Sequence, residues 1–366
     1  MPLSNVEPAN YSALLEQKVA QVSALLAPFS PPKATVYPSS PTAYRMRAEF
    51  RIWHDGDKLN YVMFRKGEPK TPIPIDYFPI GSQQIQALMP RLLARLQATP
   101  ELRRKLFQLE FLSTLAGDTL LTLIYHRKLD EHWQAEVQLL ASEFQLQVIG
   151  RSRKQKLVLD RDYVNEVLTI NDRAYHYRQY EQAFTQPNAE VNIRMIEWAC
   201  ECATQLDGDL LELYCGNGNF TLPLAGHFGQ VIATELAKTS IKAARENLTK
   251  NSITNIEMIR LSAQEVTQAM RGERTFRRLA DLPRPLANYD LRTVFVDPPR
   301  AGLDDETEKM VANFDAIIYI SCNPETLANN LQSLIHTHRL ERFALFDQFP
   351  YTDHMECGVL LTKLDA

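Results

Sequence analysis

A cysteine stands where a predicted buried strand ends, near the C-terminal end of the chain. The stretch DAIIYISCNPETLANNL contains an apolar run at 317–320, which stops at Ser321 and Cys322. Free cysteine is a common packing residue in protein cores. The ends of strands in open α/β sheets are also where ligands and reacting groups gather. Cys322 is therefore either a core residue or a nucleophile, and the residues around it must decide between the two.

Two carboxylates lie in similar surroundings. Asp297 ends another apolar run in TVFVDPPRAG, and Glu356 lies in DHMECG. A thiol and a carboxylate together suit methylation of a pyrimidine at C5, since a thiolate adding to C6 makes C5 nucleophilic. A carboxylate then removes the C5 proton so that the cysteine can leave. Cys322 precedes the helix predicted to begin at Pro324, which predicts a lowered thiol pKa. Taken alone, Glu356 is better explained as a charge at a strand end than as a catalytic residue.

A glycine-containing turn follows a predicted strand in ELYCGNGNF. Gly216 and Gly218 allow a tight turn and a close approach of a ligand to the backbone. Thr221 stands where a dinucleotide-binding turn has its third small residue, and no P-loop lysine follows, so hydride chemistry is disfavoured. Glu235 ends the next strand, where a carboxylate can accept hydrogen bonds from both hydroxyls of a ribose. The alternative for Glu235 is a residue that neighbours a helix N-cap.

This pattern resembles the class I S-adenosylmethionine-dependent methyltransferases over roughly residues 205–325. In methyltransferases that act on amines, an acidic residue or Asn followed by Pro-Pro precedes an aromatic residue. Arg300 replaces that aromatic residue in this chain, and the next strand ends with Cys322. The resemblance therefore favours methyl transfer to carbon.

The predicted strands and helices that must position these residues follow one another in a different order in different regions of the chain. From about residue 190, strands and helices alternate, which predicts a doubly wound, mostly parallel Rossmann-like sheet. Residues 41–180 mix strands and helices without strict alternation, as in an α+β domain, and apolar and polar residues alternate over 45–53. The first forty residues contain an amphipathic helix and a Pro- and Ser-rich linker. We expect domain boundaries at 1–40, 41–180 and 181–366.

Composition and charge narrow the class of protein. The chain has 366 residues and a net charge of −4. Residues 41–180 hold 21 Lys and Arg against 16 Asp and Glu, whereas residues 181–366 hold 17 against 26. A basic region joined to an acidic one points to a polyanionic partner. No apolar run is long enough to span a membrane and no secretory signal is present, so we expect a cytoplasmic protein. The five cysteines form no C-x-x-C pair, so we expect no metal and no iron–sulfur cluster.

Several motifs together identify a closer resemblance. SCNP, DPPR, FTQPN, LELYCGNGNF and FDQFPYTDHMECG resemble the RNA 5-methyluridine methyltransferases, and with YRMRAEFRIWHDG the bacterial tRNA (uracil-5-)-methyltransferases. The resemblance spans nearly the whole chain. It implies that Cys322 is the nucleophile that attacks C6 and that Glu356 is the proton acceptor. The residues implied to bind S-adenosylmethionine are Gln186, Tyr214, Gly216, Asn219, Glu235 and Asp297.

The resemblance also implies an RNA partner. Its substrate would be the T-loop uridine in the T-arm of tRNA (m5U54, ribothymidine), and the equivalent loop uridine of transfer-messenger RNA (tmRNA). Residues 41–180 would hold the RNA, and no obligate protein partner is evident. The flipped uridine leaves a gap in the base stack, which an aromatic residue could fill; His126 is a further candidate. The predicted RNA contacts are Arg45, Arg47, Arg51 and Phe107, with a solvated strand face and core packing as the alternatives.

Two rival functions stay open at this stage. An RNA 5-methylcytidine methyltransferase usually carries its cysteine in a Pro-Cys dipeptide, so SCNP favours uracil. An RNA-binding or RNA-folding module with a vestigial site would not need Cys322, Asp297 and Glu356 together. The segment 271–291 matches no motif, and we assign it no role.

Overall fold

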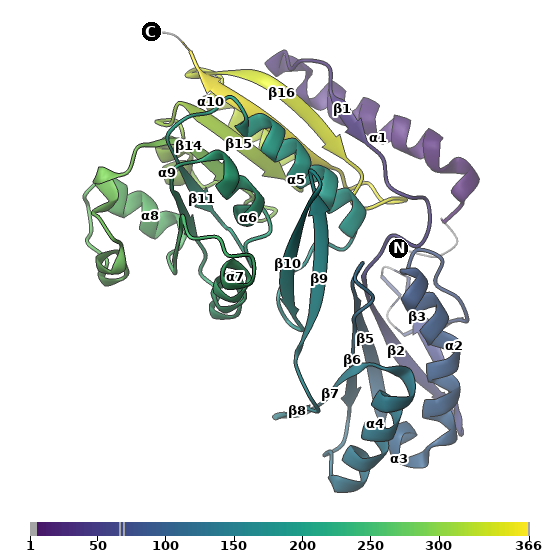
Figure 1. Cartoon of the computed structure of the whole chain (residues 1–366). Coiled ribbons are helices and arrows are strands. Elements are labelled where there is room, and N and C mark those ends of the chain that lie inside the picture. The colour runs from purple at the N-terminus through teal and green to yellow at the C-terminus, as the bar shows by residue number, and fades with distance from the viewer. Residues whose placement is uncertain (1–5, 66, 69, 365–366) are drawn as a thin grey trace. The chain divides into compact units, whose positions relative to one another are not determined.

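The computed structural model describes residues 6–65, 67–68 and 70–364, which form two compact units (Figure 1). The first unit consists of the described residues up to Tyr11 together with Ser40–Val167 and Arg178–Ala189. The second consists of Ser12–Ser39, Leu168–Tyr177 and the described residues from Glu190 onward. None of the described helices combines the length and the apolar composition that crossing a membrane requires.

The second unit is built on an eight-stranded sheet. Its strands, in spatial order, are β1 (Thr35–Tyr37), β16 (His338–Phe346), β17 (Glu356–Lys363), β15 (Ala316–Ser321), β14 (Leu291–Val296), β11 (Asp209–Leu213), β12 (Val231–Thr234) and β13 (Ile256–Ile259). Every neighbouring pair is parallel except the two that involve β17. The prediction of a doubly wound, mostly parallel sheet is confirmed.

Helices alternate with these strands along the chain. They are α1 (Tyr11–Leu26), α5 (Ala189–Ala203), α6 (Thr221–Leu224), α7 (Lys238–Lys250), α8 (Ala263–Met270), α9 (Asp305–Val311) and α10 (Pro324–Leu334), with short 3-10 turns at Pro8–Asn10, Ala27–Phe29, Ala225–His227, Arg277–Asp281 and Leu286–Asn288. Every residue of β11, β12 and β15 is buried. Strands buried on both faces carry continuous apolar runs rather than alternating ones, which is why these segments are recognisable in the sequence.

The first forty residues differ from the expected separate helix and linker. The helix exists, but Val22 and Leu26 are buried in the core of the second unit. The Pro- and Ser-rich stretch contains β1, which pairs with β16, and the ring of Tyr37 stacks on Phe346 with centroids 4.8 Å apart. An apolar helix face is stable only against a partner, and this helix finds it beside the last strands of the sheet (Figure 1).

A buried ion pair joins the same two segments. Lys18 Nζ lies 2.5 Å from Asp347 Oδ1, and both side chains are buried. Lys18 also donates to the carbonyl oxygen of Phe349 at 3.2 Å. A buried charge is costly without a partner, so this pair fixes which face of α1 meets the sheet.

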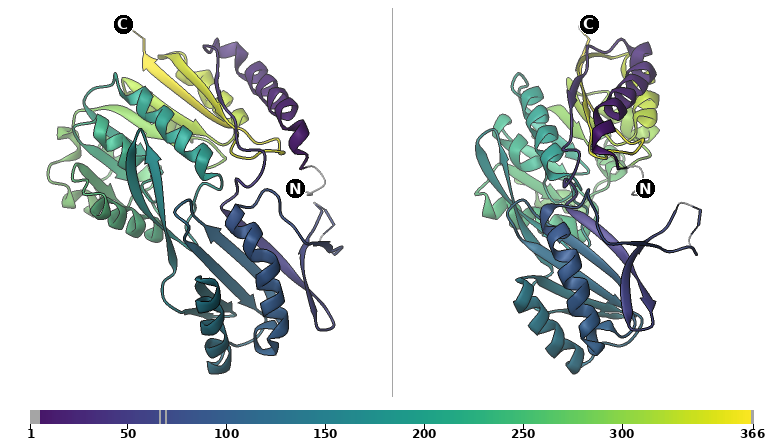
Figure 2. Two further views of the ribbon diagram at one scale, coloured as in Figure 1. Left: turned by 45° about the vertical axis from the view of Figure 1, so that its right-hand side comes forward. Right: turned by 90° about the vertical axis from the view of Figure 1, so that its right-hand side faces the viewer.

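The first unit is a seven-stranded sheet with helices on one face. Its strands, in spatial order, are β4 (Ile73–Ile75), β3 (Lys58–Met63), β2 (Arg47–Asp55), β5 (Leu106–Ser113), β6 (Thr119–Tyr125), β7 (Gln147–Ser152) and β8 (Gln155–Val158), and the helices are α2 (Gln83–Ala98), α3 (Pro100–Arg103) and α4 (Glu131–Phe144). Only β6 and β7 pair in parallel. Figure 2 shows α2 and α4 on the same side of this sheet. The predicted α+β character is confirmed.

The predicted alternation along β2 is confirmed as well. Ala48, Phe50 and Ile52 are buried, whereas Glu49 and Arg51 are exposed. The face of the sheet opposite the helices therefore carries charged side chains. A hairpin of β9 (Tyr163–Ile170) and β10 (Arg173–Tyr180) runs through both units, so the chain does not change unit once at the expected boundary of residue 180.

Candidate active site

The ends of three parallel strands meet at one edge of the second unit's sheet. Leu213 of β11 pairs with Val296 of β14 on one side and with Thr234 of β12 on the other. The residues that follow are Tyr214, Asp297 and Glu235, so these three stand at neighbouring strand ends. The strand order reverses between β11 and β14, which is where doubly wound sheets bind their ligands.

The glycine turn has the open backbone that a ligand requires. Gly216 has a φ of 57°, and a side chain built there would meet no atom within 4 Å. Gly218 has a φ of 87°, and a Cβ there would lie 2.5 Å from Leu222 Cδ1. Tyr214 has a φ of 61°, a conformation that aromatic residues rarely adopt and that often marks functional sites.

Glu235 holds the turn to the start of α7. Its Oε2 accepts a hydrogen bond from Gly216 N at 3.1 Å, and its Oε1 accepts from Leu236 N and Ala237 N, both at 2.7 Å. A carboxylate has about four acceptor positions, so one is left for a ligand hydroxyl. The two interpretations of Glu235, helix-start residue and ribose acceptor, are therefore compatible.

Asn219 is positioned by two residues that sequence reasoning missed. Its side chain exchanges two hydrogen bonds with that of Asn192, at 2.8 and 2.9 Å. Tyr177 donates its hydroxyl to the carbonyl oxygen of Asn219 at 3.1 Å. The signal for Asn192 was a polar residue among the apolar ones of α5. Gln186 belongs to the first unit, and its role as a cofactor contact stays a prediction.

Cys322 and Glu356 come together through strand pairing. Ser321, the last residue of β15, pairs with Cys357 of the antiparallel β17. The next residue beyond that pair on each strand is Cys322 and Glu356, so the thiol and the carboxylate lie at one end of the strand pair. All five cysteines are among the described residues, and only Cys322 is not buried. Cys357 belongs to the apolar core.

Burial governs the acid–base properties of this edge. The pKa of Glu356 is raised to about 8, first by burial and then by the charge of Asp297, while Arg300 opposes the shift. Burial also raises the pKa of Asp297 to about 7. The pKa of the Cys322 thiol is raised to about 11, first by burial and then by the charges of Glu356 and Asp297.

The prediction of a lowered thiol pKa at the start of α10 is therefore wrong. The helix begins at Pro324 as expected, but the side chain of Asn323 accepts a hydrogen bond from Glu325 N. The helix start is thus already capped. Burial and the two neighbouring carboxylates outweigh what remains of its positive potential.

A further carboxyl group lies in the middle of the sheet, and sequence reasoning gave it no role. Glu212 on β11 is buried, and its Oε2 has no hydrogen-bond partner. Burial first, and then the charge of Asp297, raise its pKa to about 8. A ligand that brings positive charge and hydrogen-bond donors would fit an edge with open glycine backbone and several carboxyl groups. The described residues contain no group of three or more His, Cys, Asp or Glu side chains that could hold a metal.

The predicted RNA-contacting residues lie in the first unit and differ in their surroundings. Arg47 donates to the carbonyl oxygens of Glu181 and Ala183, and Arg45 donates to the carbonyl oxygen of Arg47. These two guanidinium groups are therefore engaged by the unit's own backbone. Their RNA contacts stay a prediction.

Arg51 and Phe107 form a cluster with His126. The guanidinium carbon of Arg51 lies 3.9 Å from the centroid of the Phe107 ring, and the imidazole of His126 stacks on that ring at 4.0 Å. Phe107 stands at a β-bulge between Leu106 and Gln108, and bulges redirect side chains near functional sites. Because Arg51 and His126 both contact the ring, the outer face of the exposed His126 is the surface left for stacking.

Comparison with known proteins decides the family. A family model described as tRNA (Uracil-5-)-methyltransferase matches residues 10–364. The chain belongs to the tRNA (uracil-5-)-methyltransferase family. This confirms the resemblance that the motifs predicted.

Relatives of the tRNA (uracil-5-)-methyltransferase family match the chain over its length. The tRNA/tmRNA (uracil-C(5))-methyltransferase of Stutzerimonas stutzeri is 54% identical over 363 residues, which cover 99% of this chain and 100% of the relative. The protein of the same name from Saccharophagus degradans is 52% identical over 362 residues, which cover 99% of both chains.

A solved structure shares the fold of this family member. It is the crystal structure of Pyrococcus abyssi tRNA (uracil-54, C5)-methyltransferase in complex with S-adenosyl-L-homocysteine. The TM-score is 0.73 at 20% identity, and the match covers 96% of this chain and 84% of that one. At this identity the likeness concerns the fold.

Proposed function

We propose that this protein transfers a methyl group from S-adenosylmethionine to C5 of the T-loop uridine of tRNA, and of the equivalent loop of tmRNA. The observation that carries the proposal is the placement of Cys322 and Glu356 at one end of the β15–β17 pair. Full-length relatives named tRNA/tmRNA (uracil-C(5))-methyltransferase support the substrate. A cytoplasmic location stays a prediction.

The reaction follows from the chemistry of these two side chains. The Cys322 thiolate adds to C6 of the uracil, and the C5–C6 electron pair becomes available at C5, which takes the methyl group. Glu356 then accepts the C5 proton, the C5=C6 bond re-forms, and the sulfur leaves. S-adenosylmethionine supplies the electrophilic methyl group and the positive charge of its sulfonium. The raised pKa of Glu356, about 8, makes its ionised carboxylate a stronger proton acceptor than that of an ordinary glutamate.

The residues proposed to hold the cofactor surround the glycine turn. Gly216 offers open backbone, and Glu235 keeps one acceptor position for a ribose hydroxyl. Tyr214, Asn219 and Asp297 stand at the same sheet edge, and Gln186 is proposed as a further cofactor contact. Glu212 Oε2, which lacks a partner, is consistent with a donor-rich or cationic ligand nearby.

The RNA is proposed to contact the first unit. The Arg51–Phe107–His126 cluster combines a cation with aromatic surface, as proteins that bind unstacked bases do. Arg45 and Arg47 are proposed as weaker contributors because backbone carbonyls already engage their guanidinium groups.

The test removes the nucleophile. Cys322→Ala is expected to abolish transfer of labelled methyl from S-adenosylmethionine to a tRNA transcript, while binding of that tRNA persists. Wild-type protein is expected to form a denaturation-resistant adduct with a 5-fluorouridine-substituted T-arm, and the variant none. Cys357→Ala removes the neighbouring core thiol and is the matched control, which should keep activity.

Two outcomes would contradict the proposal. One is a normal rate in Cys322→Ala. The other is a digest of the labelled tRNA that yields 5-methylcytidine, which would favour the rival enzyme class. A wild-type protein that binds tRNA and transfers no methyl group would favour the RNA-binding module instead.

A further inference from the structure

A basic pocket lies in the first unit, away from the strand ends described above. It has a volume of about 670 Å³ and lies between the loop that follows β6 and the turn joining β7 to β8. Its lining residues are mostly basic: Tyr125, His126, Arg127, Lys128, Ser152, Arg153, Lys154 and Gln155. The motifs that identified the family include none of the residues of the β7–β8 turn.

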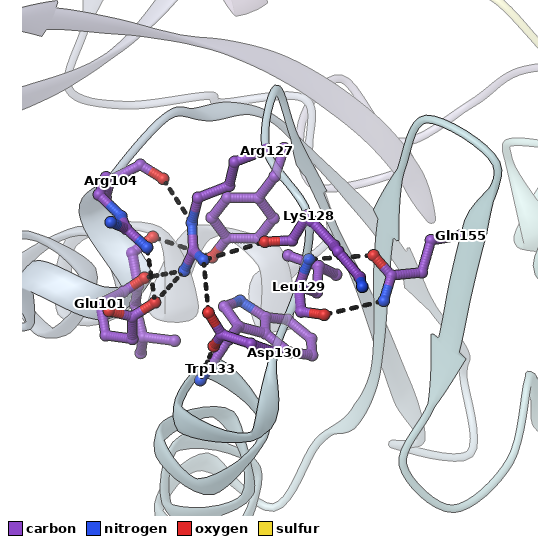
Figure 3. A network of polar contacts seen from close by, with 10 residues as sticks. Glu101, Arg104, Arg127, Lys128, Leu129, Asp130, Trp133 and Gln155 are labelled. Carbon is purple, nitrogen blue, oxygen red and sulfur yellow. Dashed lines mark hydrogen bonds and ion pairs between the residues drawn. The ribbon is translucent and has the colours of Figure 1, made fainter.

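Two side chains fix the shape of this pocket (Figure 3). Gln155 Nε2 donates to the carbonyl oxygen of Leu129 at 2.8 Å, and its Oε1 accepts from Leu129 N at 2.9 Å, which ties the β7–β8 hairpin to the loop. The guanidinium of Arg127 is bound by the carboxylates of Glu101 and Asp130. The charge of Arg127 is therefore balanced within the unit, and this residue acts as scaffold.

Three cations of the pocket are not balanced in this way. Lys128, Arg153 and Lys154 are exposed, and within the described part of the chain none of their side chains makes an ion pair. On the same hairpin, Lys156 differs, because it pairs with Asp162 and Glu181. The pocket thus keeps three positive charges available for a ligand.

Lys154 lies at the tip of the β7–β8 hairpin, in a backbone conformation that does not favour lysine. Lys154 has a φ of 61°, in the left-handed region where glycine is favoured and other residues cost roughly 1 kcal/mol. Gly or Asn would suit this turn better for folding alone. Lys154 therefore does not stabilise the turn, and its charge has no ion-pair partner within the described residues. Its presence is explained by the binding of a ligand.

We propose that this basic pocket binds the sugar–phosphate backbone of the RNA strand whose base stacks on His126, an inference that rests on the proposed function. His126 lines the pocket and also stacks on Phe107, so aromatic surface and free cations adjoin. Stacking surface beside a cationic groove is a recurring arrangement for unpaired nucleic acid strands. An acidic peptide would match the charges but would make no use of the aromatic stack.

The experiment compares Lys154→Gly with wild-type protein on a synthetic T-arm stem-loop RNA. The variant loses one charge and relieves the backbone strain. At about 0.15 M salt the Kd for the RNA is expected to rise about fivefold, and the slope of log K against log salt to fall in magnitude by about 0.7–0.9. The thermal unfolding midpoint should stay equal or rise. At saturating RNA, kcat should be unchanged while KM increases.

A double variant and a control variant test whether the effect on RNA binding comes from the charges of the pocket. Arg153→Gln combined with Lys154→Gly should reduce the salt slope by about twice as much. Lys33→Gln removes an exposed charge from the second unit and should leave Kd and slope as in wild type. Unchanged affinity and slope in Lys154→Gly would overturn the inference, as would a loss of affinity accompanied by a lower unfolding midpoint. Methyl transfer by wild-type protein in the same assay shows whether the proposed function itself holds.

Discussion

Two buried glutamates, one in each unit, share a raised pKa and differ in the hydrogen-bond donors around their carboxyl groups. Glu166 on β9 has a pKa of about 7 and accepts hydrogen bonds from Leu115 N at 3.1 Å, Ala116 N at 3.3 Å and Val167 N at 2.9 Å. Glu356 on β17 has a pKa of about 8, and no side-chain hydrogen bond is formed by its carboxylate within the described residues. Burial is the largest cause in both.

The difference shows that a raised pKa does not by itself identify a catalytic carboxyl group. Three backbone donors give Glu166 a structural task, since it holds the β5–β6 turn against β9. Glu356 has no such task, and it stands beside a thiol and a second carboxyl group whose charges interact with it. A buried carboxyl group without donors is costly to the fold, which is consistent with the catalytic role proposed for Glu356.

The largest expected effect comes from Glu356→Gln. Turnover should fall by roughly 10²–10⁴ because no group then accepts the C5 proton. The covalent RNA adduct should accumulate, since the sulfur cannot leave. Labelled methyl transfer and denaturing gel electrophoresis measure the two effects. The free energy of unfolding at neutral pH should change little. A fully active variant would show that Glu356 is not the proton acceptor.

Glu166→Gln should give the opposite pattern. The amide nitrogen of glutamine would face backbone N–H donors, so at least one buried donor loses its acceptor. The expected loss is about 1–3 kcal/mol in the free energy of unfolding, measured by urea titration, with kcat retained in the protein that stays folded. Lost turnover with unchanged stability would assign Glu166 the catalytic role that we propose for Glu356.

A smaller effect concerns the Cys322 thiol. Its pKa of about 11 includes the charge of Glu356, so Glu356→Gln should lower it by about one unit. The rate of alkylation by iodoacetamide against pH reports this titration, because Cys322 is the one cysteine of the five that is not buried. An unchanged midpoint would show that the two groups do not interact.

The smallest effect is a pH trend that both glutamates should share. An acid whose pKa is raised by folding contributes stability at low pH, and this contribution is lost as the pH rises through the folded-state pKa. The free energy of unfolding of Glu356→Gln, relative to that of wild type, should therefore increase by about 1 kcal/mol as the pH rises from about 7 to about 9. That of Glu166→Gln should increase by a similar amount between about pH 6 and about pH 8. Urea unfolding at these pH values measures both. A gain in only one variant would show that burial does not act equally at the two sites.

Much of the second unit could be predicted from the sequence. Its buried strands are continuous apolar runs, and helices such as α8 begin at a recognisable capping box of Ser262 and Glu265. Because parallel strands end at the same edge, the positions of Asp297 and Cys322 after their apolar runs were enough to place them together.

What could not be predicted depends on contacts between residues far apart in the chain. Lys18 and Asp347 are 329 residues apart, and nothing local marks either as a partner. The short strand β1 is hidden in a Pro- and Ser-rich stretch because its pairing with β16 decides its conformation. The raised thiol pKa of Cys322 depends first on burial and then on the charges of Glu356 and of Asp297, the residue after β14, which together outweigh the local signal of the helix start.

The docking of α1 beside β16 has a consequence for synthesis on the ribosome. About 310 residues separate Leu26 from His338, so at roughly 5–20 residues per second the first helix waits about 15–60 s for its partner strand. During that time its apolar side has no native surface to cover it. The first unit can therefore fold while the chain is still being synthesised. The second unit can complete its sheet only after β16 and β17 have been translated.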